Sequence, residues 1–135
     1  RLATAARGLL LGAAAEAALK VEECTGIFAA GLSAADLRHG PIATTTSMLP
    51  VLAFVHPGPA CADVLDLVAD LRARGAPTRI AGPADGSALP WPAGVPESAA
   101  TVLAVVRGQQ VALALARRLG RDPDRPPGLH KITAT

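Results

Sequence analysis

The chain has 135 residues and a mass of 13.6 kDa, which is the size of a single domain. Half of the residues are hydrophobic, only 2% are aromatic, and the net charge is +2, so the sequence offers neither the stacking platform nor the basic surface of a nucleic-acid-binding or membrane-surface protein. Two separate cysteines, Cys24 and Cys61, indicate neither a disulfide framework nor a zinc site, and they suit a reducing cytoplasm.

The first half of the chain contains four predicted elements. In chain order they are a strand over 2–6, a helix over 10–24, a short helix over 34–38 and a strand over 51–55. The strands are short apolar runs, and the long helix is rich in Ala, Leu, Glu and Lys, which favour helix. Thr25-Gly26 stops the long helix, Ser33 is a suitable N-cap for the short one, and Gly40-Pro41 breaks it.

The second half continues the alternation of helix and strand. Its predicted elements are a helix over 61–74, a strand over 77–81, an edge strand around Trp91 and a helix over 98–119 with a candidate kink at Gly108. This order predicts an α/β fold, a three-layer sandwich whose parallel sheet is flanked by helices, as in flavodoxin-like and Rossmann-like proteins. Since parallel sheets bind ligands beyond the carboxyl ends of their strands, we expect chemistry near Arg7-Gly8, His56 and Gly82.

Several common motifs are missing from the sequence. The run Gly8 to Gly12 fits no phosphate-binding glycine pattern, and no HExxH, GxSxG or metal-spaced His/Cys/Asp cluster occurs. We therefore expect no metal and no other cofactor. The longest uncharged run, 40–62, holds four prolines, so it cannot be one membrane-spanning helix, and we expect no membrane span in the chain.

The two lysines, Lys20 and Lys131, stand out among eleven arginines. An amine can form a Schiff base or sit as a compact cation beside an oxyanion, whereas a guanidinium has no titratable lone pair. Composition alone leaves chance retention of two surface lysines equally open.

Glu16, Lys20 and Glu23 follow i, i+4, i+7 spacing, which places them within a sector of about 60° on the long helix. A solvent-facing salt-bridge stripe is one interpretation. The other is a general base, Glu23, whose charge is held by Lys20. A lone exposed histidine is usually inert, but His39 lies in a stiff turn before Gly40-Pro41.

Three stretches resemble the sugar isomerase (SIS) domain family. Ala6–Gly8 with Ala14–Glu23 is similar to the family's GRG strand end and ALEGALKLKE helix, Ser33–Ala43 to its ELKHGPLA turn, and Asp122–Thr135 to its tail with the pattern D-x-D-x-P-x-x-L-x-K-[SV]-T. Within the family, the chain resembles the C-terminal isomerase half of glucosamine-6-phosphate synthase and the SIS-type glucosamine-6-phosphate deaminases.

The resemblance implies a role for each matching residue. Glu23 is the base that moves a proton between C1 and C2 of an open-chain sugar phosphate. Lys131 contacts the C2 oxygen or forms an imine, and His130 beside it binds substrate. His39 assists ring opening in the active site of the neighbouring subunit, which implies a homodimer.

The resemblance also implies how the chain is divided into a domain and a tail, and which residues support the base. Glu16 and Lys20 support the base, residues 1–120 form the C-terminal subdomain of a two-subdomain isomerase, and residues 121–135 form a tail that carries the active-site lysine. An upstream SIS subdomain supplies the phosphate loop, and a first residue other than Met fits such a segment.

We therefore expect an amino-sugar phosphate isomerase or deaminase, which converts glucosamine 6-phosphate to fructose 6-phosphate with release of ammonia. The alternatives are the isomerase half of a glutamine–fructose-6-phosphate aminotransferase, a non-catalytic module that binds phosphosugars, and a purely structural half-domain.

Overall fold

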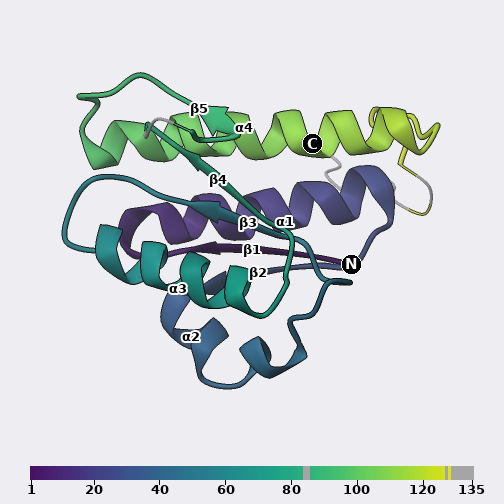
Figure 1. Ribbon diagram of the computed structural model, residues 1–135. Helices are drawn as coiled ribbons and strands as arrows, with labels where there is room; N and C mark the ends of the chain where they lie inside the picture. The colour runs from purple at the N-terminus through teal and green to yellow at the C-terminus, as the bar shows by residue number, and fades with distance from the viewer. Residues whose placement is uncertain (84–85, 127, 129–135) are drawn as a thin grey trace.

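The computed structural model describes residues 1–83, 86–126 and 128, and it contains a parallel sheet of five strands (Figure 1). The spatial order is β2-β1-β3-β4-β5, with every pairing parallel. The strands are β1 (Leu2–Ala6), β2 (Ala29–Ser33), β3 (Val51–Phe54), β4 (Thr78–Gly82) and β5 (Leu89–Pro90). This order is that of flavodoxin-like doubly wound sheets, so the predicted fold class is confirmed.

Helices cover both faces of the sheet. They are η1 (Gly8–Leu10), α1 (Leu11–Thr25), α2 (Ala34–Arg38), η2 (Pro41–Thr44), α3 (Cys61–Ala73) and α4 (Glu97–Arg118), where η denotes a 3-10 helix. In Figure 1, α1 and α4 lie together on one side of the strands, and α2 and α3 lie on the other. The architecture is therefore the three-layer sandwich expected from the sequence.

Alternate residues of the strands face the two helical layers, as the pleat of a strand requires. Val51 and Ala53 belong to the apolar cluster under α2 and α3, whereas Leu52 and Phe54 belong to the cluster under α1 and α4. The second cluster consists largely of alanines, so its two helices can approach each other and the sheet closely. The many small alanines thus produce a tightly packed layer, which also holds Phe54 and Trp91.

Two glycines make the closest of these contacts possible. A β-carbon on Gly31 of β2 would lie 2.5 Å from Ala15 Cα, and one on Gly108 of α4 would lie 2.6 Å from Ala17 Cβ. Around Gly108, the candidate kink, α4 continues as one helix of 22 residues, and the glycine lets α4 pack against α1. By length and composition α4 could also cross a membrane, and 28% of its most apolar stretch is buried in the domain. The buried residues are small and share one face of the helix: Ala100, Ala104, Gly108, Ala112 and Ala116.

Two strands depart from the sequence-based expectation. The sequence reasoning missed β2, because its residues AAGLS include no β-branched or aromatic side chain and it forms an edge of the sheet. The predicted edge strand around Trp91 is present as β5, which ends one residue earlier. The predicted cap of α2 is confirmed, since Ser33 Oγ accepts a hydrogen bond from Asp36 N at 3.0 Å.

Candidate functional site

The three charged residues of α1 meet as the helical spacing predicts. Lys20 Nζ donates a hydrogen bond to Glu23 Oε2 at 2.6 Å and lies 3.6 Å from Glu16 Oε1. About a third of each side chain is exposed: 32% for Lys20 and 35% for both glutamates. The stripe is therefore a half-buried, ordered ion triad.

The electrostatics of the stripe favour its charged form. The hydrogen bond from Lys20 to Glu23, together with the charges of both glutamates, raises the pKa of Lys20 above its usual 10.5, although partial burial opposes this. Burial, with a contribution from Glu23, raises the pKa of the neighbouring Cys24 thiol above its usual 9.0. The ammonium thus remains a fixed positive charge at neutral pH, and the thiol remains protonated.

Glu22 and Glu23 are adjacent in sequence but play different roles. Glu22 Oε1 accepts a hydrogen bond from Ala29 N at 3.1 Å, at the start of β2, so its carboxylate is part of the fold. Glu23 receives its hydrogen bond on Oε2, and within the described part of the chain no hydrogen bond reaches its Oε1. One oxygen of Glu23 is therefore available to a ligand.

His39 does not join the stripe within a single chain. It caps the C-terminus of α2, where its backbone N–H donates to Ala35 and Asp36 carbonyl oxygens, and its side chain is exposed. Because α2 and α1 lie on opposite faces of the sheet (Figure 1), the sheet separates His39 from Glu23. The other predicted site residues, His130 and Lys131, lie outside the described residues.

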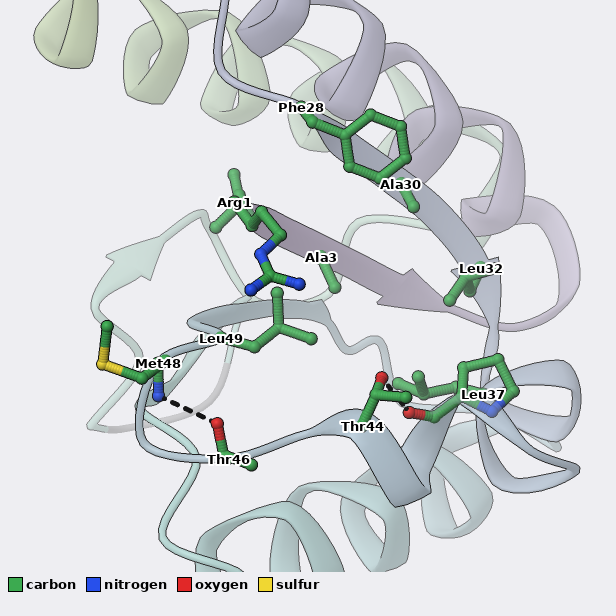
Figure 2. Close-up of a pocket in the computed structure, with 12 residues that line it drawn as sticks. Arg1, Ala3, Phe28, Ala30, Leu32, Leu37, Thr44, Thr46, Met48 and Leu49 are labelled. Carbon is green, nitrogen blue, oxygen red and sulfur yellow. Dashed lines mark hydrogen bonds between the residues drawn. The ribbon is translucent and has the colours of Figure 1, made fainter.

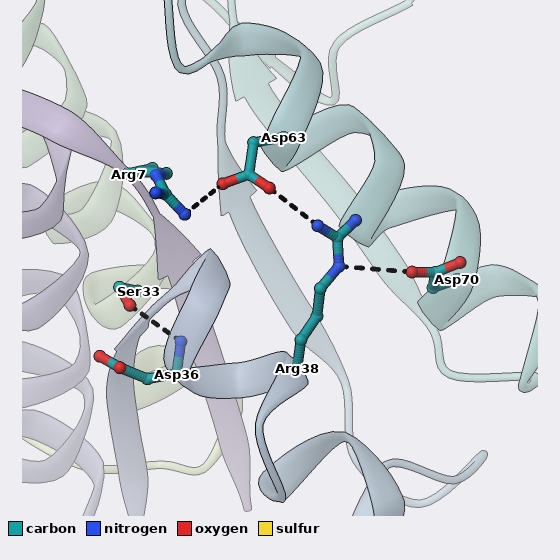
Figure 3. Close-up of polar contacts among 6 residues, drawn as sticks. All are labelled: Arg7, Ser33, Asp36, Arg38, Asp63 and Asp70. Atoms are coloured by element: carbon teal, nitrogen blue, oxygen red, sulfur yellow. Dashed lines mark hydrogen bonds and ion pairs between the residues drawn. The ribbon is translucent and has the colours of Figure 1, made fainter.

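A second charged cluster lies at the carboxyl end of β1 (Figure 3), where the sequence predicts chemistry near Arg7 but does not predict its partners. Asp63, in the first turn of α3, accepts from Arg7 Nη1 at 2.5 Å and from Arg38 Nη1 at 2.8 Å. Arg38 Nε also lies 3.4 Å from Asp70 Oδ2. Only the position of Arg7 beside a strand end, and an acid early in a helix, signalled this cluster in the sequence.

The cavities of the chain lie elsewhere. Figure 2 shows one of about 180 Å³, lined by β1, β2 and the segment that includes Thr46 and Met48. Two others, of about 310 and 500 Å³, lie beside His56 and beside Arg79. None of these three cavities is lined by the α1 stripe. Over residues 1–83, 86–126 and 128, no group of three His, Cys, Asp or Glu side chains could hold a metal ion.

Comparison with known proteins supplies a family. The sequence model of the SIS domain matches residues 1–81. A curated relative, glutamine–fructose-6-phosphate aminotransferase (isomerizing) of Gloeobacter violaceus, is 37% identical over 133 residues, which are 93% of this chain and 22% of the relative. The chain thus spans about a fifth of the length of the curated relatives that it matches.

Solved structures share the fold. The C-terminal domain of glucosamine-fructose-6-phosphate aminotransferase from Francisella tularensis superposes with a TM-score of 0.80 at 28% identity, covering 93% of this chain and 37% of that one. Glucosamine-6-phosphate deaminase from Thermotoga maritima gives a TM-score of 0.79 at 25% identity, covering 96% and 39%. In both cases the chain matches well under half of its structural relative.

Proposed function

Because this chain belongs to the SIS domain family, we propose that it is the C-terminal unit of an enzyme that isomerises an amino-sugar phosphate. The reaction is the transfer of a proton between C1 and C2 of the open-chain sugar. The observation that supports this proposal is the α1 stripe, in which Lys20 holds one oxygen of Glu23 at 2.6 Å and leaves the other available. That arrangement suits a general base, which must be both oriented and charged.

In the proposed mechanism, Glu23 removes the proton from C2 of the open-chain aldose and returns it to C1. Negative charge develops on the oxygen at C1, and a nearby cation stabilises it. For glucosamine 6-phosphate the product is a C2 imine, which water hydrolyses to fructose 6-phosphate and ammonia. By resemblance, Lys131 is the cation or the imine-forming amine, and His130 assists in binding the substrate.

The stripe needs other surfaces to enclose a substrate. Leu19, beside Lys20, is a large apolar side chain that is 44% exposed. We propose that an upstream SIS unit covers the stripe and supplies the phosphate loop, and that His39 acts on the site of a second copy in a homodimer.

A second reaction has specific support. Eight similar curated relatives are all named glutamine–fructose-6-phosphate aminotransferases, whereas a deaminase occurs among the structural relatives. Both reactions require the same proton transfer between C1 and C2. They differ in the source or fate of the nitrogen, so the proposed role of Glu23 is common to both.

The test is an assay of the full-length protein that contains this chain. Release of ammonia and fructose 6-phosphate from glucosamine 6-phosphate identifies a deaminase, and formation of glucosamine 6-phosphate from fructose 6-phosphate and glutamine identifies an aminotransferase. Saturable binding of these sugars without turnover would instead indicate a phosphosugar-binding module and would end the catalytic proposal.

Glu23→Gln is expected to lower kcat by about 10²–10⁴-fold, the usual contribution of a positioned general base. The matched control is Glu22→Gln, because the amide oxygen can still accept the hydrogen bond from Ala29 N. Equal kcat values for the two variants would remove Glu23 from the mechanism. Lys131→Arg should also lose most activity, because the guanidinium keeps the charge but cannot act as an amine.

A further inference from the structure

The carboxyl edge of the sheet holds charged groups that the proposed reaction does not use. In a sheet of this order the chain winds in opposite directions from β1 and β3, and doubly wound sheets bind ligands in the crevice between two such strands. Here β1 leads into α1 through Gly8, and β3 leads into α3 through Gly58 and Ala60. These two loops are the walls of the crevice.

Glu97, the first residue of α4, places its carboxylate between the two loops. A β-carbon on Gly8 would lie 3.0 Å from Glu97 Oε1, and one on Gly58 would lie 3.8 Å from Glu97 Oε2. The hydrogen bond between His56 Nε2 and Val95 O, at 2.8 Å, ties the segment before α4 to the end of β3. The fold therefore holds the carboxylate against both walls.

Three of the helices that begin at this edge lack a side-chain cap, whereas α2 is capped by Ser33. The N-cap residues of η1, α3 and α4 are Arg7, Ala60 and Pro96, and none makes a side-chain capping hydrogen bond. The free N–H groups at a helix start favour a nearby negative charge. Asp63 and Glu97, each in the first turn of its helix, supply the charge that a bound anion would otherwise bring.

The cations at this edge are already paired. Arg7 and Arg38 both donate to Asp63, and Arg38 also lies near Asp70 (Figure 3). Asp70 lies about two turns further along α3, so with Glu97 the charged groups of this cluster at the edge itself are two cations, Arg7 and Arg38, and two anions, Asp63 and Glu97. An entering phosphate therefore meets no net positive charge, and both guanidiniums already bind Asp63. We infer that the chain's own carboxylates close this crevice to phosphate, with Glu97 in the position that an anionic ligand would take.

A phosphosugar bound by this chain must then place its phosphate on another surface. The inference gives a physical reason why the α1 stripe would depend on a phosphate loop from a different unit. Because phosphate binding at the carboxyl edge does not involve Glu23, its measurement is independent of whether Glu23 is catalytic.

The test is a titration of the ¹⁵N-labelled chain with inorganic phosphate, followed through the backbone amide signals of Gly8 and Gly58. Glu97→Gln removes the charge and keeps the shape, whereas Glu97→Ala also opens the space. Asp66→Asn is the matched control, because Asp66 is an exposed acid on α3 away from the crevice. Thermal unfolding of each variant checks that the fold is kept. If Glu97→Ala does not fold, the phosphate titration of Glu97→Gln is the test.

The wild-type protein and the control are expected to show no saturable shift of these amides up to about 20 mM phosphate. Loss of the Glu97 charge should lower the Kd for phosphate at least tenfold, so that the shifts of both glycine amides saturate. Saturable binding of phosphate at Gly8 and Gly58 in the wild type would overturn the inference. So would the failure of every folded Glu97 variant to gain such binding.

Discussion

The closest contact between α1 and α4 gives the sharpest prediction about the fold, through the substitution Gly108→Ala. A methyl group there would lie 2.6 Å from Ala17 Cβ and 3.2 Å from Ala17 Cα, whereas carbon atoms normally pack about 3.5–4.0 Å apart. Ala17 has no side-chain torsion that could relieve the clash. The two helices must therefore separate by about 1 Å, or the backbone must bend.

The expected loss follows from two opposing effects. Overpacking of a core costs about 1–3 kcal/mol, and here the cost should be near the upper end because a backbone atom is involved. Replacing glycine in a helix gains back about 1 kcal/mol. The net destabilisation should be about 1–2 kcal/mol, which corresponds to a fall in Tm of about 3–8 °C for a domain of this size.

The assay is urea unfolding followed by circular dichroism, with Gly12→Ala as the matched control. Gly12 also lies in a helix, but a β-carbon there would meet nothing within 4 Å. The control should therefore gain up to about 1 kcal/mol of stability. If Gly108→Ala is as stable as Gly12→Ala, the tight packing of the alanine layer is not what the distances indicate.

Three further predictions concern polar contacts. Because the pKa of Lys20 is raised in the folded state, its pairing with Glu23 stabilises the fold below pH 10.5, and this contribution is lost as the pH rises through the folded-state pKa. The difference in unfolding free energy between the wild type and Lys20→Met should therefore shrink as the pH rises through that pKa. A difference that stays constant with pH would contradict the pairing. Asp63→Asn should lower the free energy of unfolding by about 1 kcal/mol, because two partly exposed guanidiniums lose their shared charged acceptor. This loss, measured by urea unfolding, should be smaller in high salt. A loss that does not depend on salt would argue against ion pairing. Thr4→Val keeps the shape of a fully buried side chain but removes the 2.6 Å hydrogen bond to Ala14 O. The midpoint of urea unfolding should fall by the equivalent of about 1 kcal/mol, with an unchanged m-value. An unchanged midpoint would show that this hydrogen bond adds no net stability.

Local sequence patterns predicted the elements with strong punctuation. The predicted bounds of β1 and α1 agree with the structure to within one residue, because Gly8 and Thr25-Gly26 mark their ends. In contrast, β2 has only Ala, Gly, Leu and Ser and is defined by its pairing with β1 rather than by its own propensities.

The sequence by itself determined the α/β class and the triad of Glu16, Lys20 and Glu23, because helical spacing brings together residues that are near in the chain. Only the tertiary structure decided that His39 lies across the sheet from that triad, and that Glu97 lies against Gly8. Such placements depend on strand order and on which face each helix covers. These are properties of the whole packed chain, so no local pattern encodes them.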